Sequence, residues 1–453
     1  MTHRLTILLA MLMCLPAGEP GLAQPPIRTL SDDGGWCWFE DERAIVHNGQ
    51  LTIGTVAAGA HDPSRKGNIE ATTYDFSTGT SYRSVLHPNL QLDDHDSPAF
   101  CVLGDGRVLA MYAKHGTENR MYYRISTKPC DTTQWQPEQV FIPSPKSRVT
   151  YSNLFRLADE NSGTGRIHNF YRGYESSFKP SWMTSDDDGR SWKSHGVWID
   201  FPNEQRHRPY VKYASNNRDT VHCVFTEGHP RNFDNSLYHA FYRDDAFFRS
   251  DGTRIKSVNE GPVIPAEATK IFAGDANNVA WPCDLHLDDQ QRPVVVFSVQ
   301  RDGAGQSRAA AEQEGDHRYR MAQWDGTRWQ DHQVAHAGTR LYKGEDDYTG
   351  LISIDPGDTN TVYLSSDVDI RNGDPNSSGH YEIYRGHTTD AGKSWTFNAI
   401  TQDSAVDNLR PIVPQTEDGR TILLWLRGSF TSYTNYDLDV VGMDVDAAPV
   451  RDK

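Results

Sequence analysis

The sequence predicts an all-β fold, a seven-bladed β-propeller of four-stranded antiparallel blades. Three observations predict it. Helical periodicity is nearly absent after residue 24, where short apolar runs alternate with turns rich in Gly, Asp, Asn and Pro. Seven segments repeat one hairpin design, and tryptophan-bearing turns recur between them. The repeats are spaced by roughly 50 residues, which fits four strands per blade.

Each of the seven hairpins contains an apolar run, a polar turn, a second apolar run and then a polar or charged cluster. They begin at Ile45, Ser97, Tyr151, Arg208, Trp281, Tyr348 and Leu409. We expect the segment GWCWFEDERAIV at 35–46 to complete the ring by pairing near LDVVGMDV at 438–445. Closure of this kind leaves few free sheet edges. Residues 25–453 are therefore expected to form one propeller that is also the catalytic domain.

Two turns between hairpins fit the pattern S/T-x-D-x-G-x-x-W, the Asp-box turn of the BNR repeat. They are SDDDGRSW, from Ser185 to Trp192, and TTDAGKSW, from Thr388 to Trp395. The Asp side chain can accept hydrogen bonds from its own turn, the Gly supplies a positive φ, and the Trp can pack between sheets. These turns are therefore interpreted as structural.

Residues 1–24 have the pattern of a secretory signal peptide. A basic start is followed by an apolar stretch from Leu5 to Pro16 and by small residues that end at Ala23. No later stretch approaches the roughly 18 apolar residues of a membrane-spanning helix. The mature protein is therefore expected to be secreted or periplasmic, with no membrane insertion.

Charge and cysteine content limit the partners. With 45 Lys and Arg against 61 Asp and Glu, the formal net charge is −16, which disfavours binding to nucleic acid or anionic lipid. An acidic polysaccharide substrate would require a local cluster of Arg and His. The five cysteines after residue 24 are widely spaced and predict no disulfide framework. The sequence does not identify a cofactor, and it leaves open a structural Ca or Zn ion. The protein is expected to be a monomer.

Polar residues recur at the ends of the predicted hairpins. In an antiparallel hairpin, the residue before the first strand and the residue after the second lie at the same end. In a propeller, that end is one mouth of the central channel. The rule brings together Arg, His and Tyr side chains from several blades: His95 with His115, Tyr151 with Arg172, Arg208 and Tyr210 with Glu227 and His229, Asp284 with Arg301, Tyr348 with Asp367, and Arg410 with Arg427.

This set of residue types favours β-elimination over ordinary glycoside hydrolysis. Hydrolysis would use two carboxylates, and none of those expected at the mouth lies on the blades rich in His, Tyr and Arg. In elimination, an Arg neutralises the carboxylate of a uronic acid, His or Tyr removes the proton on carbon 5, and a second such group protonates the leaving oxygen 4. The sequence leaves open which group is the base.

From GWCWFEDERA through DDHDSPAF, AKHG and WPCDLHLD to LLWLRGSF, the sequence resembles the BNR-repeat polysaccharide lyases, among them the ulvan lyases. The resemblance implies a seven-bladed propeller and a catalytic set of His95, His115, Tyr151 in VTYSN and Arg172 in NFYRG, with Tyr210 in RHRPY positioning the substrate. The other substrate-binding candidates at the mouth are Arg208, His229, Arg301 and Arg427.

The resemblance implies cleavage of a rhamnose-to-glucuronate or rhamnose-to-iduronate linkage in an ulvan-like polysaccharide, leaving an unsaturated uronate. One alternative is an exo-lyase or α-L-rhamnosidase that acts on arabinogalactan-type glycans, and another is a non-catalytic glycan-binding propeller. A sialidase is disfavoured because the sequence contains no Arg-Ile-Pro tripeptide. Some members of the family hold a structural zinc with His and Cys, but Ala240 and Tyr242 stand where such cysteines would be expected.

Overall fold

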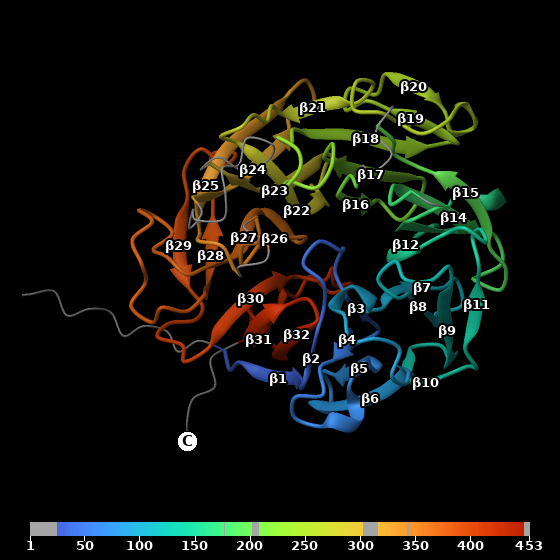
Figure 1. Cartoon of the computed structure of the whole chain (residues 1–453), viewed down its shortest axis with the longest axis horizontal. Helices are drawn as coiled ribbons and strands as arrows, with labels where there is room; N and C mark the ends of the chain where they lie inside the picture. The colour runs from blue at the N-terminus through green and yellow to red at the C-terminus, as the bar shows by residue number, and fades with distance from the viewer. Residues whose placement is uncertain are drawn as a thin grey trace, which may run out of the picture.

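Seven antiparallel sheets stand around a common axis as the blades of a propeller (Figure 1). The structure is a computed structural model that describes residues 25–175, 177–201, 208–301, 316–341, 345 and 347–447. The predicted signal peptide, residues 1–24, lies outside this part of the chain. Within it, no helix is long and apolar enough to cross a membrane. The predicted fold class is confirmed.

The strands follow the chain order around the ring, and each blade runs from the channel outward. Blades 1 and 2 contain β2 (Gly34–Gly35), β3 (Ala44–His47), β4 (Gln50–Ala57), β5 (Ile69–Asp75) and β6 (Thr80–His87), then β7 (Ala99–Val102), β8 (Val108–Tyr112), β9 (Met121–Lys128), β10 (Asp131–Trp135) and β11 (Gln139–Phe141). Blades 3 and 4 contain β12 (Thr150–Leu157), β13 (Arg166–Arg172), β14 (Pro180–Ser185) and β15 (Lys193–Val197), then β16 (Val211–Ser215), β17 (Thr220–Phe225), β18 (Leu237–Arg243), β19 (Ala246–Phe248), β20 (Arg254–Ser257) and β21 (Thr269–Phe272).

The remaining blades have four strands each. Blades 5 and 6 contain β22 (Val279–Leu287), β23 (Pro293–Gln300), β24 (His317–Trp324) and β25 (Trp329–Gly338), then β26 (Ile352–Asp355), β27 (Asp358–Ser366), β28 (Glu382–His387) and β29 (Thr396–Ala399). Blade 7 contains β30 (Asp407–Ile412), β31 (Ile422–Ser432), β32 (Asn435–Asp444) and, from the other end of the chain, β1 (Arg28–Ser31). The helical elements of the described residues are the 3₁₀ turns η1 (Pro63–Arg65), η2 (Asp94–Asp96), η3 (Asn161–Gly163) and η4 (Val258–Glu260).

The position of a strand in its blade explains its sequence pattern. Strand β23, PVVVFSVQ, is buried along its whole length because the neighbouring blades cover both of its faces. Strand β6, TSYRSVLH, lies at the outer edge of blade 1 and is exposed over most of its length. The apolar runs that identified the hairpins are therefore the inner strands, and their burial stabilises the ring by about 25 cal/mol per Å² of apolar surface.

The ring closes through a segment that differs from the predicted one. Strand β1 pairs with β32, with Arg28 opposite Gly442, so the closing strand precedes the segment 35–46. Within that segment, Gly35 of β2 and Ala44–His47 of β3 both pair with β4 in blade 1. The prediction was wrong because the innermost strand of blade 1 is divided into two short pieces.

Residues 36–43 connect these two pieces and leave the sheet, and we name them the plug loop. In Figure 1 the blue chain between β2 and β3 projects into the middle of the ring. The four consecutive residues Trp36, Cys37, Trp38 and Phe39 are at most 2% exposed. The Phe39 ring stacks on Trp281 of blade 5, with centroids 3.5 Å apart and planes inclined by 7°. The plug loop therefore supplies the apolar core of the central channel.

Buried charges hold the plug loop in place. The Arg43 guanidinium pairs with Glu40 at 3.0 Å and donates to the Ser152 carbonyl of blade 3 at 2.8 Å. The Glu40 carbonyl accepts hydrogen bonds from Arg410 of blade 7, at 2.8 Å, and from Lys212 of blade 4. The loop is thus tied to three blades, which fixes its position relative to the channel mouth.

The two Asp-box turns have the predicted structural role. Asp187 accepts hydrogen bonds from the N–H and the hydroxyl of Ser191 at 2.8 and 2.7 Å, and Asp390 accepts the same pair from Ser394 at 2.9 and 2.7 Å. Trp192 lies edge-on to Tyr123 of the preceding blade, with centroids 6.1 Å apart. Both turns therefore stabilise blades and lie outside the polar cluster described next.

Candidate active site

His95 and His115 meet at one mouth of the channel, as the hairpin rule predicts. His95 lies in η2, shortly before β7, and His115 follows β8. Because β7 and β8 are antiparallel, with Ala99 opposite Met111, these two positions belong to the same end of blade 2. Their rings stack face to face, with centroids 3.7 Å apart and an angle of 9°.

One carboxylate joins the two rings. Asp93 lies 2.7 Å through Oδ1 from His95 Nδ1 and 2.9 Å through Oδ2 from His115 Nδ1. The sequence analysis did not single out Asp93, although the run DDHD places it two residues before His95. If both Nδ1 atoms donate hydrogen bonds to Asp93, the Nε2 atom of each ring is the nitrogen that can take part in proton transfer. Asp93 therefore sets the orientation of the pair.

The two histidines differ in protonation. Burial opposes charge on His95, but Cys37, Asp93 and Asp94 outweigh it and raise the pKa of His95 well above its ordinary value. Burial and the charge of His95 lower the pKa of His115 to about 4. His115 is also the more accessible ring, 23% exposed against 4% for His95. At neutral pH the mouth therefore holds one imidazolium and one neutral imidazole, and the neutral ring is the one that a ligand can reach.

Tyr151 comes from the innermost strand of blade 3. The register of β12 shifts between Thr150 and Asn153, and within this bulge Tyr151 has φ 60°. A positive φ is uncommon for an aromatic residue and marks local backbone strain. The Tyr151 ring stands edge-on to His95, with centroids 5.2 Å apart. The bulge thus places the phenol beside the histidine pair.

Tyr151 keeps its proton at neutral pH. Burial is the largest cause that raises the pKa of Tyr151 well above its ordinary value, and Cys37 and Tyr210 add to it, while Arg172 opposes it. The Cys37 thiol of the plug loop lies 3.8 Å from the phenol oxygen, which makes at most a weak hydrogen bond. Because this buried phenol keeps its proton, it is in the form that a general acid requires and not in the form that a general base requires.

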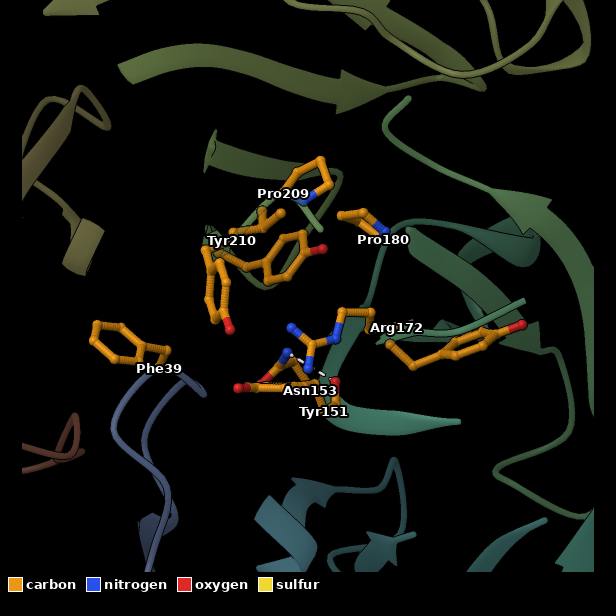
Figure 2. Close-up of a pocket in the computed structure, with 10 residues that line it drawn as sticks. Phe39, Tyr151, Asn153, Arg172, Pro180, Pro209 and Tyr210 are labelled. Carbon is orange, nitrogen blue, oxygen red and sulfur yellow. Dashed lines mark hydrogen bonds between the residues drawn. The ribbon is translucent and has the colours of Figure 1, made fainter. Parts of the chain in front are cut away.

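Arg172 lies between two tyrosines at the end of β13 (Figure 2). Its guanidinium carbon is 4.1 Å from the centre of the Tyr151 ring and 5.3 Å from that of Tyr210. Its Nε is buried and has no hydrogen-bond partner among the described residues. Phe39 and Asn153 line the same cavity. A planar, permanently charged group with an unused donor suits a carboxylate ligand.

Three further candidates belong to blade 4. Tyr210, just before β16, stands edge-on to Tyr151, with centroids 6.2 Å apart. His229 is edge-on to Tyr210 at 5.5 Å, and its Nε2 lies 3.8 Å from Glu345. Arg208 is half-buried at the start of the same blade, with its guanidinium carbon 5.9 Å from the centre of the Phe178 ring. The structure thus extends the polar cluster from blade 2 to blade 4.

Arg301 and Arg427 are set apart from the cluster. Both side chains are exposed, and within the described residues neither contacts His95, His115, Tyr151 or Arg172. Arg301 is fixed through its backbone N–H, which donates to the Asp316 carbonyl at 2.9 Å. Arg427 lies on β31 opposite Asp439. The structure provides no contact that links either arginine to the histidine pair.

The expected placement of Asp284 at the mouth needs correction, whereas Glu227 lies just after β17, at the expected end of blade 4. Strand β22 begins at Val279, so Asp284 lies several residues further into the channel, where it accepts from the Ile354 N–H at 2.9 Å. Glu227 accepts from the Tyr238 hydroxyl at 2.6 Å and is thereby engaged within blade 4. Neither carboxylate joins the cluster, which agrees with the absence of a hydrolytic carboxylate pair there.

Four groups of described residues bring three possible metal ligands within 4.8 Å of one another. They are Cys37, Asp94 and His95; Asp93, His95 and His115; Glu42, Asp284 and His286; and His229, Glu345 and Asp347. A zinc site of His and several Cys does not fit the residues around Cys223, because this thiol donates to the Ala240 carbonyl at 3.3 Å and no other cysteine of the described residues joins it in such a group.

Tyr433 also borders the histidine pair and was missed by the sequence analysis. It lies in the turn between β31 and β32 of blade 7, and its ring is edge-on to His95 and His115, at 5.3 and 5.7 Å. The hairpin rule took Arg427 as the residue after the second strand of blade 7, whereas β31 continues to Ser432, so Tyr433 is the residue that follows it. A residue in such a turn reaches the centre only because the ring is closed.

The fold and the cluster together define a β-propeller with a polar site at one mouth, and comparison with known proteins agrees with this class. A family model described as a BNR repeat-containing family member matches residues 56–337. The match covers more than half of the chain, so the protein belongs to the BNR repeat-containing family. A search of curated proteins finds no match.

Solved structures share the propeller. An ulvan lyase of polysaccharide lyase family PL25, bound to -[GlcA(1-4)Rha3S]-, is 13% identical, with 94% of this chain and 97% of the other covered and a TM-score of 0.68. The polysaccharide lyase Uly1 is 11% identical, with 94% and 100% covered and a TM-score of 0.54. Identities this low establish the shared fold alone.

Proposed function

We propose that the protein is a secreted, monomeric polysaccharide lyase. It cleaves a rhamnose-to-uronate linkage of an ulvan-like acidic polysaccharide by β-elimination and leaves an unsaturated uronate. The observation that carries the proposal is the position of Arg172, stacked on Tyr151 next to the His95–His115 pair. A carboxylate bound to this guanidinium would lie beside both a proton acceptor and a proton donor.

Arg172 prepares the uronate for proton loss. The hydrogen on carbon 5 is acidic only when the adjacent carboxylate does not repel the developing negative charge. The buried guanidinium of Arg172 supplies that neutralisation in a setting where water screens it little. Tyr210 packs against the other side of the site and limits how the carboxylate can turn.

His115 and Tyr151 divide the two proton transfers. The Nε2 atom of the neutral His115 takes the proton from carbon 5, a double bond forms between carbons 4 and 5, and the bond from carbon 4 to its oxygen breaks. The Tyr151 hydroxyl gives its proton to that oxygen, so the leaving sugar departs as an alcohol. Exchange with water then restores both groups. His95 remains an imidazolium and stabilises the negative charge of the intermediate.

The substrate class rests on charge and on the neighbouring structures. The chain carries a formal net charge of −16, yet Arg172, His95 and Arg208 gather cationic groups at the mouth. The described ulvan lyase with a similar propeller binds a glucuronate-rhamnose sulfate repeat. These observations support a uronate within an acidic chain as the ligand.

The direct test is to mix the purified protein with ulvan and follow the ultraviolet absorbance of the new carbon–carbon double bond. Rhamnose-capped arabinogalactan and glucuronan serve as comparison substrates. We expect absorbance to rise with ulvan. Rhamnose release without absorbance would instead indicate a hydrolase, and binding without any product would indicate a glycan-binding propeller. Either result, or no reaction and no binding at all, would overturn the proposal.

A further inference from the structure

Blade 7 supplies a side chain that completes the wall of the histidine pair. Tyr433 stands perpendicular to His95 and His115, at angles of 87° and 86°. Its backbone carbonyl accepts the Asp94 N–H at 2.9 Å, which ties the blade 7 turn to the loop that carries His95. Tyr433 therefore has a fixed position relative to the reacting groups.

Tyr433 and Tyr151 flank the same two rings, but their surroundings differ. Tyr151 is 7% exposed and covered by Arg172, whereas Tyr433 is half-buried. The Tyr433 hydroxyl has no hydrogen-bond partner in the part of the chain that the structure describes, and its ring contacts only the two histidines among the aromatic side chains described. A half-exposed phenol with an unused hydroxyl at the mouth is available to a ligand.

The stereochemistry of elimination indicates which sugar lies there. Carbon 5 of the uronate bears the carboxylate. Carbon 4 is the next ring carbon and bears, through oxygen 4, the sugar that leaves. If the carboxylate contacts Arg172 of blade 3, carbon 5 faces His115 and oxygen 4 lies within reach of the Tyr151 hydroxyl, the sugar attached to oxygen 4 extends past the histidine pair that Tyr151 flanks. Blade 7 closes the ring beside blade 1 and so approaches the histidines from the side of blade 2 that is remote from blade 3 (Figure 1).

We infer that Tyr433 contacts the sugar attached through oxygen 4 of the uronate, the sugar that leaves. Tyr433 is thus a substrate-contacting residue that determines which sugar is accepted on that side of the scissile bond. This inference rests on the proposed lyase function, because it takes its direction from the carboxylate on Arg172. A purely structural Tyr433 would support the histidines and would affect every substrate equally.

Binding of two oligosaccharides tests the contact. The affinities are measured in the background Tyr151→Phe, in which turnover is expected to be at least about 100-fold slower. The two ligands are GlcA(1-4)Rha3S, whose uronate has a free oxygen 4, and the same disaccharide extended by Rha3S at that oxygen. We expect Tyr433→Ala to weaken binding of the extended ligand about tenfold, the order expected for one lost contact. Binding of the unextended ligand should remain within twofold. Tyr433→Phe keeps the ring and should weaken binding less.

Tyr82→Ala is the matched control, since Tyr82 is 54% exposed on the outer strand of blade 1. It should leave both affinities unchanged. Equal effects of Tyr433→Ala on the two ligands, or none, would overturn the inference. In the otherwise native protein, Tyr433→Ala should lower kcat/KM on ulvan mainly through KM. If the native protein forms no double bond on ulvan, the proposed function fails and this inference fails with it. If elimination is normal but Tyr433→Ala leaves the ratio of the two ligand affinities unchanged, only this inference is overturned.

Discussion

His95 and His115 stack at 3.7 Å and share the two oxygens of a single carboxylate, Asp93. Two imidazolium rings at this distance would repel each other strongly. One anionic Asp93 between them instead stabilises a pair that carries one positive charge in total. The arrangement creates, from two identical residues, one ring that is charged at neutral pH and one that is neutral.

Replacing Asp93 should disrupt the pair without disrupting the fold. Asp93→Asn keeps the shape of the side chain but removes the negative charge and one of the two acceptors. We expect kcat on ulvan to fall about 100-fold, the upper range for loss of a group that orients a reacting histidine. Initial rates from double-bond absorbance measure the effect, and thermal unfolding checks the fold.

Asp96 offers a matched control at the end of the 3₁₀ turn that Asp93 caps. Burial and the neighbouring Asp93 raise the pKa of Asp96 well above its ordinary value, which favours the neutral form of this fully buried carboxyl. Asp96→Asn should therefore leave kcat within about threefold. If Asp93→Asn were as active as Asp96→Asn, Asp93 would have no part in positioning the histidines.

The neutral state of His115 predicts an unusual pH profile. His115 accepts a proton only when it is neutral, and burial lowers its pKa to about 4. Activity should therefore persist at pH 5 to 6 and decline only as the pH falls through about 4. An NMR titration of the His115 ring, assigned by comparison with His115→Asn, measures the same pKa independently. A decline of kcat/KM centred on the ordinary histidine value of about 6.5 would contradict this assignment.

Tyr151→Phe should remove the acid and keep the ring under Arg172. Loss of a positioned proton donor typically costs about 10²- to 10⁴-fold in rate, and we expect kcat to fall in this range. The free energy of unfolding should change little, because the weak contact with Cys37 is the only hydrogen bond of the phenol oxygen within the described part of the chain. Tyr171→Phe is the control: the Tyr171 hydroxyl is buried and has no hydrogen-bond partner among the described residues. A Tyr151→Phe enzyme that cut ulvan at the normal rate would exclude Tyr151 as the acid.

Arg172→Lys should strongly reduce activity although it keeps the positive charge. An ammonium group cannot spread its charge over a plane, stack on the Tyr151 ring or bind a carboxylate through two parallel N–H groups. We expect kcat/KM on ulvan to drop about 10²- to 10³-fold, the range seen when a group that stabilises developing charge is removed. Substrate titrations of initial rate give this ratio. Arg427→Lys, at an exposed site away from the histidines, should retain normal kinetics, and equal losses in both variants would contradict the role of Arg172.

The plug loop predicts a large effect on stability. Phe39 is 2% exposed and stacks on Trp281, so Phe39→Ala would leave a cavity in the centre of the ring. We expect the free energy of unfolding to fall by about 3 to 5 kcal/mol. Denaturant unfolding at equilibrium measures it, with Tyr82→Ala as an exposed aromatic control. A loss below about 1 kcal/mol would show that the plug loop contributes little to the core.

The sequence by itself determined the fold class, the Asp-box turns and the meeting of His95 with His115. These features follow from local rules: apolar runs become buried strands, a turn satisfies its own polar groups, and the two ends of an antiparallel hairpin must lie at one side. Tyr151 and Arg172 come together for the same reason, since Thr150 and Arg172 pair across β12 and β13.

The tertiary structure alone decided the rest. The plug loop occupies the channel because seven inner strands leave a space that an apolar loop can fill, and no local pattern distinguishes such a loop from a surface one. Ring closure through β1 and the approach of Tyr433 to His95 join positions from opposite ends of the chain. The unequal pKa values of His95 and His115 likewise depend on Asp93, on Asp94 and on burial, which exist only once the blades have assembled.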